Sequence, residues 1–313
     1  MEPDADPPQG LPAFDPALLE LLSKPLLRDL SARLQGGGRA PVLALNGPVG
    51  AGKSSLARLL QSQAAGAGIR LAVASIDDLY LPWPQRRQRL AGNPFGVWRV
   101  PPGSHDLPLL LDALARWRRD GVLRLPRFDK TLAHGQGDRS GWREQRADAL
   151  LLEGWLMGCR PLGDRQAEAL RRAPLNPPAT ATELAWLPRW DRELRAYEAL
   201  WAACDGLWLL RPVHWGLPRR WRFQAEARQR RAGGGWLAAK ELDSLVAASL
   251  RSLPPPLYQD PLLGTSAIPL AQPSGEKTPA LELLGGVVLD GRRRARALPG
   301  AQDSLSSLSA AIG

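Results

Sequence analysis

Cysteine is scarce in this chain of 313 residues, which contains only Cys159 and Cys204. Two thiols exclude a disulfide framework and lack the spacing of a metal site, so both are expected to be buried and reduced. Long apolar runs are also missing, because none approaches the ~20 residues that a membrane-spanning helix needs. The first ten residues, MEPDADPPQG, are acidic and proline-rich, unlike a signal or transit peptide. We therefore expect a cytoplasmic protein with no membrane partner.

Lysine is scarce as well, although the chain is strongly basic. Five of its 41 basic residues are lysines, and the formal net charge is +10. Such a charge can indicate nucleic-acid binding. The arginines are spread through the predicted helices instead of forming one block, which disfavours a nucleic-acid partner. A basic surface also suits a protein whose substrates are anions such as ATP and a carboxylate.

Short apolar runs alternate with helical patterns along most of the chain, which is typical of a doubly wound parallel α/β sheet. The predicted strands are 41–46, 70–75, 148–153 and 206–210, and the predicted helices are 15–34, 56–65, 107–120, 190–203, 218–231 and one ending near 250. We divide the chain into an N-terminal helical segment (1–38), a main α/β domain (39–253) that includes a basic helix at about 218–231, and a proline-rich C-terminal extension (254–313). A small hairpin is expected around Asp290-Gly291.

The strongest motif is GPVGAGKS at 47–54, a complete G-x-x-x-x-G-K-[ST] pattern between a predicted strand and a predicted helix. Its glycines let backbone N–H groups close around phosphates, because a Cβ would block the approach. Lys53 is expected to reach the β- and γ-phosphates, and the Ser54 hydroxyl to bind Mg²⁺. The predicted cofactors are ATP and Mg²⁺, and the predicted nucleotide-binding residues are Gly47, Gly50, Gly52, Lys53, Ser54 and Ser55.

Carboxylates follow two other predicted strands, at the sheet edge where ligands bind in such folds. Asp77 and Asp78 follow 70–75, and Glu153 ends 148–153. Adjacent residues of an extended chain point in opposite directions, so one aspartate faces the substrate and the other can cap the next segment. We expect Asp77 to be the base that accepts the proton of a hydroxyl. Glu153 is predicted to hold Mg²⁺, directly or through water; a helix-capping role is the structural alternative.

Several narrower motifs resemble the D-glycerate 3-kinases of plants, fungi and cyanobacteria, within the wider group of uridine kinase, pantothenate kinase and phosphoribulokinase. The similar segments, in the order of that family and within about 41–250, are SIDDLY (75–80), 93–106 with its PGSHD, PRFDK (126–130), GQGDR (135–139), EGWLMG (153–158) and WRFQAE (221–226). The chain departs from the family pattern at Val100, where a glycine is usual, and at Phe128, where a tyrosine is usual. It also has a proline-rich insertion around 172–180. After the helix at 218–231 it has GGGWLAAKEL in place of the usual family sequence.

The resemblance implies that residues 39–253 form a doubly wound P-loop kinase domain with a lid helix at about 218–231. It also implies that this kinase phosphorylates the 3-hydroxyl of D-glycerate, with Asp77 as catalytic base. A carboxylate substrate needs arginine, and Arg99, Arg127 and Arg139 lie inside the matching motifs. The remaining acceptor-site residues that it implies are Asp78, Tyr80, His105 and Asp129. On the lid helix, Arg222 and Arg230 are expected to close over the phosphates.

Two other functions fit parts of the sequence. A kinase for another acceptor, such as a nucleoside or pantothenate, would share the P-loop, but a nucleoside site needs an aromatic platform where this chain offers arginines. A P-loop switch or scaffold would share the nucleotide site without an acceptor site, and the motifs at 93–139 argue against it. We therefore expect ATP and a small hydroxy acid as the partners of this protein.

Overall fold

A computed structural model describes residues 14–233, 237–264 and 280–299. Its strands are β1 (Val42–Asn46), β2 (Leu71–Ser75), β3 (Val122–Asp129), β4 (Asp138–Arg146), β5 (Ala149–Gly154), β6 (Gly206–Pro212), β7 (Leu283–Leu289) and β8 (Ala295–Ala297). The longer helices are α2 (Lys24–Gln35), α3 (Lys53–Gly66), α5 (Leu107–Asp120), α7 (Ala181–Glu193), α9 (Leu217–Arg231) and α10 (Ala239–Arg251). Shorter ones are α1 (Pro16–Leu18), η1 (Leu19–Ser23), η2 (Ile76–Leu79), α4 (Trp83–Arg89), η3 (Gly163–Arg165), α6 (Gln166–Arg172), η4 (Leu194–Tyr197), α8 (Glu198–Ala203), α11 (Pro255–Tyr258) and η5 (Asp260–Leu263).

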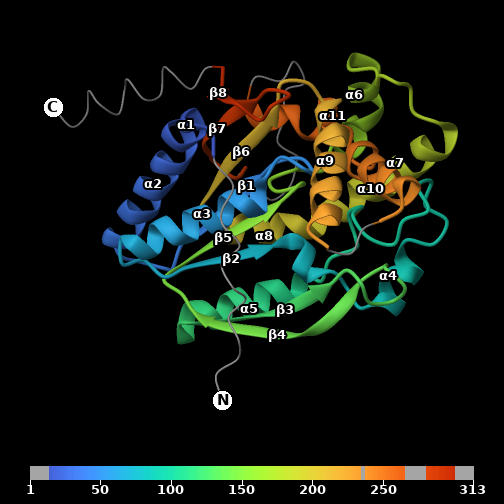
Figure 1. Ribbon diagram of the computed structural model, residues 1–313. Helices are drawn as coiled ribbons and strands as arrows, with labels where there is room; N and C mark the ends of the chain where they lie inside the picture. The colour runs from blue at the N-terminus through green and yellow to red at the C-terminus, as the bar shows by residue number, and fades with distance from the viewer. Residues whose placement is uncertain (1–13, 234–236, 265–279, 300–313) are drawn as a thin grey trace.

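The main sheet of the described residues has six strands in the order β2-β5-β1-β6-β7-β8 (Figure 1). Every neighbouring pair is parallel except β7 and β8. β1 lies between β5 and β6, and the P-loop follows it directly. The predicted fold class, a doubly wound parallel α/β sheet, is confirmed.

The two faces of this sheet are covered by separate sets of helices, because side chains alternate along each strand. On β1, Leu43 and Leu45 pack with apolar residues of η1, α2, α3 and α9 on one face. Val42 and Ala44 point to the other face and pack with residues of α5, α7, α8 and α10. Each buried strand therefore carries a continuous apolar run with a different layer of the core on either side.

The predicted hairpin near the C-terminus forms, with Asp290 at its turn, and it belongs to the main sheet. β7 pairs in parallel with β6, and β8 returns beside β7. In Figure 1 the described start of the chain, α1, lies next to this hairpin. Asp15 fixes this contact, since its carboxylate accepts a 2.7 Å hydrogen bond from the N–H of Ala295. The predicted helix of the first segment and the hairpin of the last one thus share a hydrophobic core with the P-loop domain.

Two features differ from the sequence-based expectation. The single helix expected at 190–203 is divided into the end of α7, the tighter turn η4, and α8. A second, two-stranded antiparallel sheet, β3–β4, was not expected at all. On β3, Leu123 and Leu125 are buried while Arg124 between them is exposed, which is the alternation of a half-buried strand. No helix within the described residues is long and apolar enough to span a membrane.

Candidate active site

The P-loop is shaped by glycines that adopt backbone conformations closed to other residues. Gly50 and Gly52 have φ angles of +76° and +96°. A Cβ on Gly50 would lie 2.6 Å from the backbone nitrogen of Arg222, so α9 packs directly against the middle of the loop. A Cβ on Gly47 would lie 2.9 Å from Cβ of Leu210. The spacing of glycines in the motif therefore reflects close packing as well as the approach of phosphates.

Lys53, Ser54 and Glu153 meet at the end of the P-loop. Lys53 Nζ donates to the carbonyl of Gly47 at 2.8 Å and lies 3.8 Å from Glu153 Oε2. Ser54 Oγ donates to Glu153 Oε1 at 2.7 Å. Hydroxyl and carboxylate oxygens are ligands that suit Mg²⁺, which usually keeps water and substrate phosphates as further ligands. The residues present thus fit the expected metal, and Ser55 lies half-buried in the same first turn of α3.

The two aspartates have different partners, but they lie in the 3-10 helix η2 and not on the extended chain that was expected to alternate their side chains. Asp77 Oδ1 accepts a 2.8 Å hydrogen bond from the hydroxyl of Tyr80. Burial acts to raise the pKa of Asp77, but the charges of Lys130 and Lys53 and this hydrogen bond outweigh it, so the pKa lies below its ordinary value. Asp78 turns back and accepts from the N–H of Ser75 at 3.3 Å in a capping box. Burial raises the pKa of Asp78. The geometry places Asp78 in the local turn.

A stack of buried rings lies beside Asp77. The ring of Tyr80 stacks on His105 with a centroid distance of 4.7 Å. His105 Nδ1 lies 2.6 Å from the hydroxyl of Tyr197, whereas Nε2 is buried with no partner among the described residues. The Tyr197 hydroxyl also accepts from the N–H of Gly103 at 3.3 Å. Burial lowers the pKa of His105 to about 4, which keeps the ring neutral near pH 7.

The three arginines expected to bind the acceptor differ in what they contact. Arg99 is buried, and its Nη1 donates to the carbonyl of Gly135 at 3.0 Å. Arg139 pairs with Asp106 at 2.7 Å and also donates to the carbonyl of Tyr80, so it ties the two neighbouring segments together.

Arg127 and Asp129 lie at the end of β3, where PRFDK resembles the family motif. Arg127 is exposed and has no ion pair within the described part of the chain. Asp129 is occupied in its own turn, where it accepts from the N–H and the hydroxyl of Thr131. Phe128, the position of the missing tyrosine, lies edge-on to the ring of Tyr80 at 5.0 Å.

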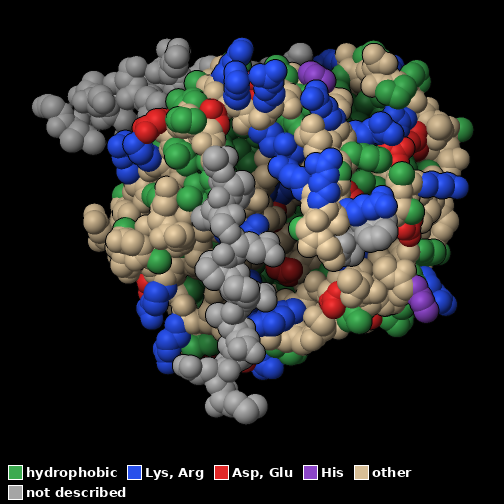
Figure 2. Space-filling model, in the orientation of Figure 1, with side chains coloured by type: hydrophobic (Ala, Val, Ile, Leu, Met, Phe, Trp, Pro, Cys, Tyr) green, Lys and Arg blue, Asp and Glu red, His purple; other side chains and the backbone are tan. Residues whose placement is uncertain are grey.

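The predicted lid helix is α9, and both of its selected arginines lie on it. Arg222, next to Gly50, forms a 2.9 Å ion pair with Glu226 one turn further on. Arg230 is exposed in the last turn. Figure 2 shows Lys and Arg side chains gathered over α9, with a hollow beneath them that has an acidic side chain at its floor.

Three basic residues of the site were missed from the sequence. Arg86 is fully buried and donates to four backbone carbonyls in the segments that carry the acceptor motifs, at Leu81, Trp98, Gln136 and Gly137. Burial lowers its pKa to about 10. Lys130, after β3, supplies the largest positive influence on Asp77. Arg293, in the C-terminal hairpin, contacts the P-loop. Only Lys130 lay in a recognised motif, PRFDK, and could have been found there.

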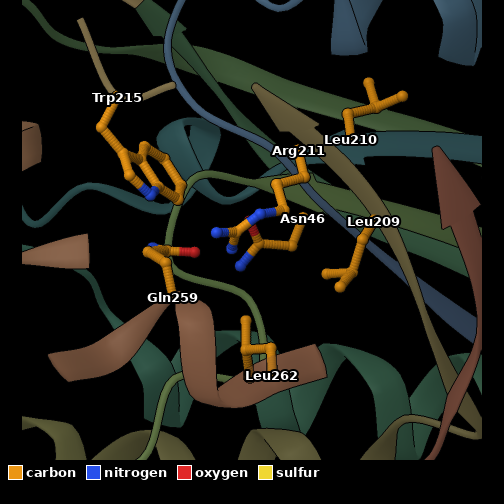
Figure 3. Close-up of a pocket in the computed structure, with 7 residues that line it drawn as sticks. All are labelled: Asn46, Leu209, Leu210, Arg211, Trp215, Gln259 and Leu262. Atoms are coloured by element: carbon orange, nitrogen blue, oxygen red, sulfur yellow. The ribbon is translucent and has the colours of Figure 1, made fainter. Parts of the chain in front are cut away.

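A small cavity lies near the P-loop at the end of β1 and β6 (Figure 3). It has a volume of about 10 Å³, and its lining residues are Asn46, Leu209, Leu210, Arg211, Trp215, Gln259 and Leu262. Several of these polar groups already have partners: Asn46 donates to the carbonyl of Met157, and Arg211 and Trp215 both donate to Asp260. The volume suits about one water molecule and is too small for a substrate.

The P-loop follows the central strand, a carboxylate lies beside its lysine and serine, and α9 packs on the loop, an arrangement that fits a P-loop kinase. No family model matches the chain. It is similar to a D-glycerate 3-kinase from Cryptococcus neoformans var. grubii, with a TM-score of 0.70 and 26% identity over 88% of this chain and 97% of the other. The resemblance to D-glycerate 3-kinases seen in the motifs is therefore confirmed.

Two further similarities were found, one in sequence and one in fold. A kinase of Schizosaccharomyces pombe, mug58, described as uncharacterized, is 27% identical over 219 residues, which are 66% of this chain and 78% of the relative. The solved YGR205w protein has a TM-score of 0.65 and 20% identity over 88% of this chain and 97% of its own, a likeness of fold.

Proposed function

We propose that this protein transfers the γ-phosphoryl group of MgATP to the 3-hydroxyl of D-glycerate and forms 3-phosphoglycerate. The observation that carries the proposal is the position of the acceptor motifs. The segments that resemble D-glycerate 3-kinases include Asp77, His105 and Arg99. Tyr80 donates to Asp77 and stacks on His105, which supports a common acceptor site for these segments. The similarity to a solved D-glycerate 3-kinase extends over 88% of the chain and supports the same assignment.

On the phosphate side, the chain contributes positioning and charge. P-loop N–H groups and Lys53 bind the polyphosphate, while Ser54 and Glu153 hold Mg²⁺. When bound, Mg²⁺ neutralises negative charge on the phosphate oxygens. Arg222 and Arg230 on α9 add positive charge over the group that is transferred. In a loose transition state most of the rate acceleration comes from such positioning and charge neutralisation.

On the acceptor side, Asp77 orients the attacking hydroxyl and takes its proton as the new O–P bond forms. Its lowered pKa keeps it ionised at neutral pH. Tyr80 occupies Oδ1 of Asp77, which leaves Oδ2 for the substrate. Since the proton transfer occurs late in a loose transition state, a weak base suffices.

The carboxylate of glycerate requires a cation in a partly desolvated place. Arg99 meets this need because it is buried and, among the described residues, gives one hydrogen bond, to the carbonyl of Gly135. A guanidinium binds a carboxylate with two parallel hydrogen bonds. Arg127 is the second candidate for this contact. Nε2 of His105, which has no partner among the described residues, is available for a hydrogen bond with the acceptor.

The test is a comparison of substrates with the purified protein and MgATP. We expect kcat/KM for D-glycerate to exceed that for its methyl ester, uridine and pantothenate by at least about 10²-fold. The ester and uridine have no carboxylate to pair with the arginine, and the carboxylate of pantothenate lies much farther from its hydroxyl than that of glycerate. A preference for uridine or pantothenate would overturn glycerate as the substrate and leave the kinase class in place. Binding of ATP with no phosphorylation of any hydroxyl compound would favour a switch protein instead.

A further inference from the structure

Arg293 joins the C-terminal hairpin to the nucleotide site across 243 residues of sequence. It lies in the turn after β7, with a φ of +62° that is uncommon for a residue with a side chain. Asp290 fixes this turn, since its side chain accepts from the N–H groups of Arg292 and Arg294 at 2.8 and 2.9 Å. The carbonyl of Asp290 accepts from the N–H of Arg293 at 2.8 Å.

The guanidinium of Arg293 contacts the P-loop and α9 at the same time. Nε donates to the carbonyl of Gly50 at 3.0 Å, and Nη2 donates to the carbonyl of Trp221 at 3.1 Å. Nη1 lies 3.3 Å from Gln224 Oε1, and the group sits 5.4 Å from the ring centre of Trp221. Trp221 in turn donates from Nε1 to the carbonyl of Gly291 at 3.3 Å. The turn and α9 are therefore linked in both directions.

The contact falls at a closely packed point of the P-loop. Gly50 has a left-handed φ, and α9 packs so closely on it that a Cβ would clash with Trp221 and Arg222. Arg293 holds the carbonyl of Gly50, and the N–H at the other end of the same peptide group, that of Ala51, donates to the carbonyl of Pro48 at 3.2 Å. Arg293 has no carboxylate partner in the described ranges, and burial together with the nearby Arg228 and Arg220 lowers its pKa. Its hydrogen bonds thus go to the backbone of the site.

We propose that Arg293 is a positioning residue for nucleotide binding, which sets the P-loop backbone at Gly50 against α9. A P-loop binds phosphate through preorganised N–H groups, so a loop that must order itself binds more weakly. The proposal rests on the binding of MgATP in the proposed function and is independent of the acceptor. It makes the C-terminal hairpin part of the nucleotide site.

The experiment measures MgATP binding by calorimetry with the purified full-length protein and no acceptor present. Arg293→Gln should raise Kd for MgATP by about tenfold, the size expected for lost hydrogen bonds from a charged donor. Arg293→Lys, which keeps the charge but reaches fewer of the three acceptors, should raise it about threefold. The matched control is Arg292→Gln, an exposed arginine of the same turn, which should leave Kd within about twofold.

Steady-state kinetics distinguish a role of Arg293 in positioning the P-loop from a role in the stability of the fold. In Arg293→Gln we expect KM for MgATP to rise with Kd while KM for the acceptor stays within about twofold. A folded Arg293→Gln whose Kd equals that of the wild type would overturn the proposal. So would failure of both Arg293 variants to fold, which would make Arg293 a residue of stability alone. If the wild type does not phosphorylate glycerate but the Kd values for MgATP change in the variants as expected, glycerate is not the substrate and the inference on Arg293 stands.

Discussion

The phosphate side and the acceptor side of the site are built by different means. The phosphate side consists mainly of backbone: one contiguous loop, its glycines, and the first turn of α3. The proposed acceptor side would consist of side chains from η2, the segment before α5, and both strands of the β3–β4 sheet. Buried arginines hold these pieces together, as Arg86 does through four backbone carbonyls. A contiguous backbone site can be read from one motif, whereas a site assembled from side chains depends on packing.

The largest expected effect is on the phosphate side. Lys53→Ala should reduce kcat by at least about 10³-fold, because it removes a cation from the developing charge. The secondary structure should be unchanged, since no core side chain is lost. Steady-state kinetics with circular dichroism checks both statements. A folded variant with turnover within about tenfold of the wild type would show that this P-loop is not the site of transfer.

The next effect separates the two aspartates of η2. Asp77→Asn should lower kcat by at least about 10²-fold, because the amide cannot accept a proton. Asp78→Asn should cost less than about tenfold, since an amide oxygen can still accept from the N–H of Ser75. The two variants are isosteric and serve as controls for each other in the same assay. The reverse order would mean that Asp78 is the base.

A smaller effect concerns the acceptor carboxylate. Arg99→Met should raise KM for D-glycerate by about tenfold or more, the size of a lost charge-assisted pair, with KM for MgATP within about twofold. Arg127→Met should act in the same direction if both arginines reach the substrate. Arg124→Met is the matched control, because Arg124 lies on β3 like Arg127 and forms an exposed ion pair with Glu144. Equal KM values in all three variants would move the carboxylate site elsewhere.

The smallest expected effect is on stability, through the neutral His105. The pKa of His105 in the folded protein, about 4, lies below the ordinary value near 6.5. Between these pH values the unfolded chain binds a proton at this ring and the folded protein does not. This contribution to stability is complete above pH 6.5 and is lost as the pH falls toward 4. Between pH 7.5 and pH 5 it amounts to about 2 kcal/mol.

Urea unfolding at these two pH values measures the loss directly. His105→Asn has no titrating ring, so its free energy of unfolding should fall by about 2 kcal/mol less than that of the wild type over the same interval. An unchanged pH dependence in the variant would show that His105 is not kept neutral by the fold.

The sequence predicted the strands β1, β2, β5 and β6 because each is a continuous apolar run before a polar end. The P-loop was predictable since glycine spacing reports backbone shape. The division of α7 from α8 was missed. The β3–β4 sheet was missed as well, because the segments PRFDK and GQGDR were interpreted as functional motifs and the short apolar alternation at Leu123 and Leu125 was not used. Arg86 and Arg293 could not be predicted, since their partners are carbonyls of residues distant in sequence, which leave no local pattern.

The pairing of the first helices with the last hairpin also affects the order in which the protein can form during synthesis. The apolar face of η1 and α2, with Leu22 and Leu26, packs in the same layer as Val287 and Leu289 of β7. A chain that emerges from its N-terminus must leave part of this face uncovered until β7 has been made. The support that Arg293 gives to Gly50 arrives in that same late step. The nucleotide loop is therefore encoded early in the chain and completed by residues made some 240 positions later.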